Sequence, residues 1–463
     1  MGNKFTSRLL GELCHEITVG FVGSMTNEYI ENGIPFLRSK NIDEYDVKWD
    51  DMKYVSPEFH KKLSKSALKP GDVAIVRTGK PGTTCVIPNY LSEANCSDIV
   101  IARVNDELLC PHYLSYFMNA MAHGQVNAHV VGAVQQHFNV GSAKKIEIPL
   151  PSRIMQAEIV KILKALDDKL KLNRQINQTL EQMAQTLFKS WFVDFDPVID
   201  NALDAGFFEQ DLAFPEELLR RVEVRKVARE NSDFKSLPED IRELFPAAFE
   251  ECAEPSLGLG GWVPERWNIG CISDVAHYRS KRIETSELTL TNYISTENML
   301  SDKKGIQQAA SLPTVNSVPA YTSGTVLISN IRPYFKKIWL AKGDGGYSND
   351  VLGFEVNDLK TESYLFNLMY QDTFFDFMMA TSKGSKMPRG DKKAILGWNI
   401  VVPPLILRIF FSEKVSDFYT VGHLRDHENT ILTNLRDTLL PKLISGELSL
   451  SDINIDSVDG ALA

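Results

Sequence analysis

The sequence has no apolar run long enough to suggest a membrane segment. The longest run, Ile400–Phe411, contains two prolines and Arg408 and is too short to cross a bilayer. No secretory signal is visible, and the loose match of the first residues to an N-myristoylation pattern has no supporting feature. We therefore expect a cytoplasmic protein that has no membrane partner.

Cysteine is scarce, and its spacing predicts no metal or redox site. The six cysteines include no Cys-x-x-Cys pair. We expect them to be reduced and mostly packed. They are Cys14, Cys85, Cys96, Cys110, Cys252 and Cys271.

The motifs of common catalytic sites are also absent. There is no phosphate-binding loop with a Gly-Lys-Ser/Thr ending, no His-Glu-x-x-His, and no Asn-Pro-Pro-aromatic tetrad of the kind amino-methyltransferases use. The glycines at 258, 260 and 261 lack the strand and helix of a dinucleotide site. Asp167-Asp168-Lys169 faintly resembles a nuclease cluster, but its place inside a long helical pattern favours solvated helix surface. We predict no catalytic residue, no metal and no cofactor on this chain.

The net charge of −10 argues at first against nucleic acid, but the acidic residues are localised. The stretch Asp196–Ser256 holds 16 acidic and 7 basic residues, and Glu447–Ala463 holds 4 acidic and none basic. The rest of the chain is therefore net +3 and is free to carry basic faces. The acidic stretch is predicted to be a connector between the two halves. Its excess charge could form a docking surface or could simply be solvated surface, and both alternatives stay open.

The chain repeats itself at an offset of about 252 residues. Ser97-Asp98-Ile99-Val100 corresponds to Asn349-Asp350-Val351-Leu352, and Asn177 corresponds to Asn429. Each half has β-rich runs bounded by turn residues, followed by prolines and a long helical pattern. The sequence therefore predicts an α+β fold of two similar mixed α/β units.

Two long amphipathic helices are expected, Ser152–Ser190 and Leu405–Ser445. The first has apolar residues at a spacing close to 3.5 and would be roughly 58 Å long. One such helix cannot bury its stripe alone, so we expect the two to pair antiparallel. The alternative, each packing on its own unit, stays open because Gly422 and Arg425 interrupt the second stripe.

Basic, glycine-rich loops occur at matching places in the two halves. Lys and Arg reach phosphates, and Arg, Gln and Asn can contact base edges, so the loops predict DNA contact. The predicted DNA-binding residues are Arg77, Thr78, Lys80, Gln135, Gln136 and Asn139 in the first half, and Asn330, Arg332, Lys336, Lys383, Lys386 and Arg389 in the second.

Several segments together resemble one known family. They are Gly71-Asp72-Val73-Ala74-Ile75-Val76, Ile148-Pro149-Leu150-Pro151, Asn173-Arg174-Gln175-Ile176-Asn177 running into Ser190-Trp191-Phe192-Val193-Asp194, Gly261-Trp262-Val263-Pro264, and Leu440-Pro441-Lys442-Leu443. The chain resembles, over nearly its whole length, the DNA-specificity subunits of type I restriction–modification systems. The second helix departs from the pattern, with Leu407-Arg408-Ile409 where the first has Ala157-Glu158-Ile159-Val160.

The resemblance implies two target recognition domains separated by two long antiparallel helices that form a coiled-coil spacer. The expected parts are a first recognition domain (1–150), a spacer helix (151–195), an acidic connector (196–261), a second recognition domain (262–402), a second spacer helix (403–446) and an acidic tail (447–463).

The same resemblance implies a non-catalytic subunit whose partners are double-stranded DNA, two methyltransferase subunits and motor-nuclease subunits. S-adenosylmethionine is expected on the methyltransferase. Phe188, Trp191 and Phe192 are candidate partner-binding residues. A single-chain restriction or modification enzyme and a coiled-coil scaffold without DNA remain as alternatives.

Overall fold

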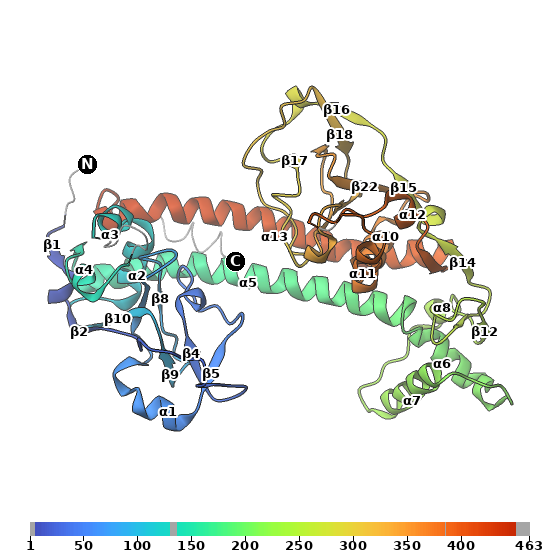
Figure 1. The fold of residues 1–463 in the computed structure, drawn as a ribbon, viewed down its shortest axis with the longest axis horizontal. Coiled ribbons are helices and arrows are strands. Elements are labelled where there is room, and N and C mark those ends of the chain that lie inside the picture. The colour runs from blue at the N-terminus through green and yellow to red at the C-terminus, as the bar shows by residue number, and fades with distance from the viewer. Residues whose placement is uncertain (1–4, 130–136, 385, 451–463) are drawn as a thin grey trace. The chain divides into compact units, whose positions relative to one another are not determined.

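The computed structural model describes residues 5–129, 137–384 and 386–450 (Figure 1). The chain divides into two compact units. Unit 1 consists of Met1–Gln175 with Arg425–Ala463, and unit 2 of Ile176–Leu424. Unit 1 is therefore discontinuous in sequence, whereas unit 2 is one continuous segment.

Unit 1 is built around a four-stranded antiparallel sheet that is buried on both faces. Its strands lie in the order β2, β10, β7, β8. Val73 and Ile75 of β7 pack in one core, and Ala74 and Val76 pack in the other. Burial on both faces explains why this strand reads as an unbroken apolar run. The strands are β2 (Cys14–Val19), β10 (Ile99–Val104), β7 (Val73–Val76) and β8 (Thr84–Val86).

Helices cover one face of this sheet, and a second, five-stranded sheet covers the other. Tyr113 and Phe117 bring helix α2 into the first core, while Leu37 and Cys96 bring strands β4 and β9 into the second. The second sheet has the order β3 (Tyr29–Ile30), β5 (Lys53–Val55), β4 (Ile34–Leu37), β9 (Ala94–Cys96) and β6 (Ala67–Leu68). The short helices are η1 (Leu10–Glu12), η2 (Ser39–Asn41), α1 (Pro57–Lys62), η3 (Ser64–Ser66), α2 (Pro111–Ala120), α3 (His123–His129) and α4 (Val140–Lys144), and β1 (Ser7–Leu9) pairs with β11 (Glu147–Pro149).

Unit 2 repeats this arrangement. Its central sheet has the order β15 (Ala276–Tyr278), β22 (Val351–Val356), β19 (Val326–Ser329) and β20 (Ile338–Leu340). Its second sheet has the order β16 (Arg282–Glu284), β18 (Ser317–Tyr321), β21 (Gly345–Tyr347) and β17 (Tyr293–Ile294). The short helices are α9 (Ile272–Val275), η5 (Thr285–Glu287), η6 (Pro333–Phe335), α10 (Glu362–Tyr370), α11 (Asp372–Ala380) and α12 (Lys392–Leu396), and β14 (Asn268–Cys271) pairs with β23 (Asn399–Val402).

The 252-residue offset holds in three dimensions. Helix α12 and strand β23 begin 252 residues after α4 and β11, and β22 begins 252 residues after β10. In both central sheets the first residue of the repeated strand pairs with the last residue of its neighbour, Ile99 with Val76 and Val351 with Ser329, so β19 follows β7 by 253 residues. The predicted internal repeat and the α+β fold class are confirmed.

Two long helices, α5 (Arg153–Phe192) and α13 (Leu405–Ser445), complete the units. In unit 1, Leu166 and Leu170 of α5 pack against Leu432 of α13. In unit 2, the ring centroids of Phe188 and Phe411 lie 5.7 Å apart. Residue numbers rise along one helix as they fall along the other, so the helices are antiparallel, as predicted (Figure 1).

The two helices begin in equivalent ways despite their different sequences. The Gln156 Nε2 donates to the Pro151 carbonyl at 3.0 Å, and the Arg408 Nε donates to the Pro403 carbonyl at 3.2 Å. Both side chains are buried. The second helix therefore uses an arginine where the first uses a glutamine to bind the carbonyl of the preceding proline. The position of that side chain relative to the helix start is the same in both.

The acidic connector is folded and packs on the core of unit 2. Val198, Leu218 and Ile241, from three different helices, are all buried in that core. Its elements are α6 (Asp196–Asp204), η4 (Phe207–Glu209), α7 (Glu216–Glu230), α8 (Glu239–Arg242) and β12 (Phe249–Glu251), and β12 pairs with β13 (Trp262–Pro264), which follows the connector.

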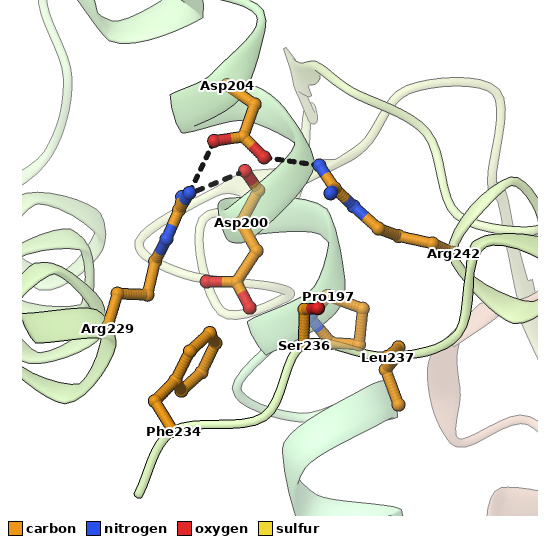
Figure 2. A pocket seen from close by; sticks show the side chains of 8 residues that line it. All are labelled: Pro197, Asp200, Asp204, Arg229, Phe234, Ser236, Leu237 and Arg242. Carbon is orange, nitrogen blue, oxygen red and sulfur yellow. Dashed lines mark hydrogen bonds and ion pairs between the residues drawn. The ribbon is translucent and has the colours of Figure 1, made fainter. Parts of the chain in front are cut away.

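Arginines of α7 and α8 pair with the aspartates of α6. Arg221 binds Asp196, Arg225 binds Asp200, and both Arg229 and Arg242 bind Asp204. Figure 2 shows the last two arginines approaching Asp204 from opposite sides. The pocket between them measures about 30 Å³, which is room for about one water. These carboxylates are therefore structural partners, and the surrounding pocket is too small for a ligand.

The Asp167 carboxylate likewise differs from the prediction of solvated helix surface. It lies 2.9 Å from Arg436 Nη1, and its other oxygen accepts a 2.6 Å hydrogen bond from the Tyr116 hydroxyl. The Arg436 guanidinium also stacks over the Tyr45 ring, 5.3 Å from the ring centroid. The prediction holds for Asp168, which is exposed, and is wrong for Asp167, because Arg436 of α13 and Tyr116 of α2 cover that side chain.

Three further findings come from the described ranges. No helix there combines the length and apolar character needed to cross a bilayer. No group of three or more His, Cys, Asp or Glu side chains in those ranges is placed to hold a metal ion. All six cysteines carry free thiols.

Candidate nucleic-acid interface

In unit 1, the loop after β7 is tied to the turn between β9 and β10. Arg77 Nη1 lies 3.0 Å from Asp98 Oδ1, and the Thr78 hydroxyl donates to Asp98 Oδ2 at 2.9 Å. Asp98 has a left-handed backbone, with φ of 53°. Lys80 lies further along the loop and is exposed. One carboxylate thus orients two of the predicted DNA-binding residues.

The equivalent loop of unit 2 follows β19 and meets the equivalent aspartate. The Asn330 backbone N–H donates to the Asp350 carbonyl at 2.9 Å. The Asn330 side chain is buried, and its Oδ1 has no hydrogen-bond partner among the described residues. Arg332 and Lys336 both have left-handed backbones, with φ of 50° and 49°. Lys336 Nζ lies 2.9 Å from Asp372, which raises the pKa of the lysine.

The third predicted loop of unit 1 joins the first. Gln135 and Gln136 lie outside the described residues. Asn139 caps helix α4, its side chain accepting a hydrogen bond from the Ser142 N–H at 2.9 Å. Beside it, the Phe138 N–H donates to the Arg77 carbonyl at 3.1 Å. The two loops therefore meet, although about sixty residues separate them.

The matching loops of unit 2 also meet. The Arg332 N–H donates to the Pro388 carbonyl at 2.8 Å, and Arg389 Nη2 lies 3.1 Å from Asp350 Oδ1. Lys383 pairs with Asp391, the residue equivalent to Asn139, at 2.6 Å. That lysine and two helical N–H groups lower the pKa of Asp391 to about 2. Lys386 is exposed.

The structure therefore brings most of the predicted residues together, though with different partners in each unit. Arg77 and Thr78 gather at Asp98, and Arg389 gathers at Asp350 with the backbone of Asn330. Lys80 and Lys386 remain as exposed cations. The arrangement suits DNA, because exposed cations can neutralise phosphates while pinned polar side chains keep a fixed geometry.

Phe188, Trp191 and Phe192 lie inside the core of unit 2, with exposed fractions of 1%, 3% and 8%. Trp191 stacks on Phe410, and Phe192 packs edge-on against Tyr364. The rings therefore do not form an exposed docking face on this chain. A role for them in binding a partner subunit stays a prediction.

Sequence reasoning missed a further loop in each unit. Buried asparagines, Asn41 and Asn298, anchor loops that lie beside the Asp98 and Asp350 turns. Both belong to a short pattern, Leu37-Arg38-Ser39-Lys40-Asn41 and Ile294-Ser295-Thr296-Glu297-Asn298. These segments are 257 residues apart, so a search at the 252-residue offset passes over them.

The comparisons with known proteins agree with this geometry. Residues 5–182 match the family model for the type I restriction modification DNA specificity domain. The chain is 24% identical over 417 residues to the HindI specificity subunit of Haemophilus influenzae, covering 83% of this chain and 88% of that protein. It is 20% identical over 433 residues to the MjaIX specificity subunit of Methanocaldococcus jannaschii, covering 92% and 89%.

A solved structure shares the fold. The S subunit of a type I restriction–modification system from M. genitalium aligns with a TM-score of 0.53 at 12% identity, over 95% of this chain and 96% of that one. The sequence matches lead to one conclusion: residues 5–182 carry a type I restriction modification DNA specificity domain, and the chain as a whole is similar to type I restriction enzyme specificity subunits.

Proposed function

We propose that this chain reads a bipartite DNA site, with each unit contacting one half-site, and that it carries no catalytic centre of its own. The observation that supports this most directly is the repetition of the loop cluster around Asp98 and Asp350 in a chain whose residues 5–182 match the DNA specificity domain. Two similar reading surfaces on one chain suit a target made of two separated sequences.

The chemistry then belongs to partners. We propose that two methyltransferase subunits, carrying S-adenosylmethionine, dock on this chain and methylate adenine, and that motor-nuclease subunits join for cleavage. The alternative of a single-chain enzyme finds no support in the specificity subunits to which the chain is similar. We place this work in the cytoplasm, where the DNA is.

The test is a methylation map of genomic DNA from cells with and without the gene, with the methyltransferase supplied. A split adenine motif that depends on the gene is expected. An active methyltransferase whose motif does not change would contradict the proposal, and the purified chain would then be assayed for activity of its own.

The predicted loop cations provide a second test. Replacing Lys80, Arg332 and Lys386 by Ala should weaken DNA binding while assembly with the methyltransferase is retained. Loss of each phosphate contact should lower the salt dependence of log K by about 0.9. If DNA binding is unchanged in the triple variant, these loops do not contact DNA. That result would favour the alternative of a coiled-coil scaffold without a DNA role.

We further propose that the paired helices set the spacing of the half-sites. Seven residues added after Gln175 and seven added before Arg425 lengthen both helices by about 10.5 Å. This corresponds to about three base pairs at 34–36 Å per helical turn. The methylated motif should keep both half-sites and gain a longer gap. An unchanged gap in an active complex would reject the spacer role.

A further inference from the structure

In unit 1, a buried asparagine holds a loop through its backbone. Asn41 is fully buried. Its Nδ2 donates to the carbonyls of Lys48 at 3.1 Å and Asp50 at 3.2 Å, and its Oδ1 accepts from the Arg38 N–H at 3.1 Å. The Lys48 N–H donates to the Asn41 carbonyl at 2.8 Å. All these bonds use main-chain groups of the loop, so its shape does not depend on the side chains it presents.

Asn298 holds the corresponding loop of unit 2 in the same way. It is 3% exposed, and its Oδ1 accepts from the Ser295 N–H at 2.6 Å. Its Nδ2 donates to the carbonyl of Gln307 at 2.9 Å, and the Gln307 N–H returns a 2.8 Å bond to the Asn298 carbonyl. The hydrogen bonds therefore match Arg38 with Ser295 and Lys48 with Gln307, and Lys40 and Glu297 correspond because each directly precedes the anchoring asparagine.

Both loops adjoin the turn already placed in the candidate interface. The Ser39 hydroxyl donates to the Asp98 carbonyl at 2.9 Å. In unit 2, Asp350, Glu297 and Gln307 line one open groove of about 290 Å³ whose wall is mainly polar side chains. The anchored loop is thus a third element of the same surface, beside the loops that follow β7 and β19.

The same frame carries opposite side-chain chemistry in the two units. Lys40 and Lys48 are exposed in unit 1, where Glu297 and Gln307 are exposed in unit 2. The Lys40 ammonium and Arg38, together with Lys53, surround the single carboxylate of Asp51 and hold its pKa well below the usual range. Residues 38–48 hold three basic and three acidic side chains, so the loop has no net charge, and its hydrogen-bond donor character comes from the exposed Lys40 and Lys48.

These side chains suit different base edges. Lys and Arg donate to the O6 and N7 acceptors of guanine, whereas Glu accepts from the N4 amino group of cytosine and Gln pairs with the N6 and N7 of adenine. We propose that the Asn-anchored loops are specificity elements: residues 38–48 read acceptor-rich base edges in one half-site, and residues 295–307 read a base with an exposed amino group in the other. This inference rests on the proposed function, since it assigns bases to residues of the same DNA-reading surface.

The test exchanges the charges at the matched position. The variants Glu297→Lys and Lys40→Glu are each expressed in full chains with the methyltransferase, and the methylated motif is mapped. Glu297→Lys should change the accepted base at one position of one half-site, and Lys40→Glu should change a position in the other. The gap and the untouched half-site should stay as in the wild type. A good base contact discriminates by about 10- to 100-fold, so the change in relative methylation should be of that order.

Matched controls carry the same charge change away from the loops. Glu230→Lys lies on the exposed face of α7 in unit 2, and Lys62→Glu lies in α1 of unit 1. Both should leave the motif unchanged. Thermal unfolding of each complex identifies any variant that misfolds. For such a variant, Glu297→Gln, which is isosteric, or Lys40→Met, which keeps most of the side-chain length without the charge, takes its place, and it should relax discrimination at that one position.

Two results would overturn the inference while leaving the proposed function standing. One is an unchanged motif in well-folded Glu297→Lys and Lys40→Glu complexes. The other is an equal loss of methylation at all sites, which would mark phosphate contacts instead of base contacts. A wild-type complex that gives no split motif would instead be a failure of the proposed function itself.

Discussion

Arg425 Nη1 donates a 2.8 Å hydrogen bond to Asn173 Oδ1, and the two residues are 252 positions apart, so each is the other's repeat counterpart. Asn173 is fully buried, and its Nδ2 also donates to Glu428 at 2.8 Å and Asn429 at 3.1 Å. Every polar atom of this amide has a partner on α13. A satisfied buried amide fixes the register of two helices, because sliding by one turn would leave it unpaired.

The first prediction concerns this amide. Asn173→Ala should destabilise the chain by about 1–3 kcal/mol, because Arg425 and Glu428 lose a buried partner. Urea unfolding of the purified protein measures the effect. Asn434→Ala removes an exposed amide on the same α13 helix and should change stability by less than about 0.5 kcal/mol. Equal midpoints for the two variants would show that the buried network is dispensable.

A second prediction uses the two helix starts. Gln156 accepts a 2.8 Å hydrogen bond from the buried Cys110 N–H, whereas its counterpart Arg408 reaches Asp358 at 3.1 Å. Unit 1 has an aspartate, Asp106, at the position equivalent to Asp358. Gln156→Arg should therefore be tolerated better than Gln156→Met, which is of similar size but leaves polar groups unpaired. The measurement compares the unfolding midpoints of the two variants. A Met variant at least as stable as the Arg variant would show that Gln156 and Arg408 do not play equivalent roles at the two helix starts.

The connector gives a third prediction. Asp196 is 5% exposed and accepts hydrogen bonds from the Ser190 hydroxyl at 2.8 Å and Arg221 Nε at 2.9 Å. Asp196→Ala should cost on the order of 1–3 kcal/mol and loosen α7. Limited proteolysis with mass spectrometry should show faster cleavage within α7. Glu223→Ala, which removes an exposed partner of Lys226, should be cut at the wild-type rate.

A fourth prediction concerns thiol chemistry. Burial raises the pKa of Cys14 from 9.0 to about 12, which lowers its thiolate fraction at pH 8 about a thousand-fold. Burial also raises the pKa values of Cys85 and Cys96. At pH 8 a thiol reagent should modify the half-buried Cys252 and Cys271 first, and Cys14, Cys85 and Cys96 only after unfolding.

The same shift has a defined sign for stability. Folding keeps the Cys14 thiol protonated, so its contribution is complete below about pH 9 and is lost as the pH rises toward 12. A Cys14→Ser chain should lack this part of the alkaline loss. Rapid labelling of Cys14 in the native protein at pH 8 would contradict the burial that the shift depends on.

The repeated sheets and long helices followed from the sequence because their signals are local and periodic. Val73–Val76 is an apolar run, and the spacing of Leu163, Leu166 and Leu170 marks a helix face. Phe188 and Trp191 were predicted as candidate partner-binding residues, because the pattern of apolar residues does not say what covers them. In unit 2 the second long helix and α10 do so, and a partner subunit is not required.

The details of the interface were not predictable in the same way, because they depend on contacts between distant segments. The sequence near Arg77 does not predict its pairing with Asp98. That pairing depends on strand β7 lying next to strand β10. The anchored loops were not predicted because the offset between the two halves is not constant. It is 252 residues at Asp98 but 257 residues at Asn41. A comparison of the two halves that allowed insertions would have aligned Asn41 with Asn298.

The discontinuity of unit 1 has a consequence for how the chain is made. The core under its sheet includes Leu440, Leu443 and Ile444, which the ribosome adds more than 300 residues after Leu10 of the same core. Unit 2 is a single continuous segment and can close before synthesis ends. The N-terminal unit must therefore wait, with part of its apolar surface uncovered, until nearly the last helical turn of α13 has been translated. The unit synthesised first is completed last.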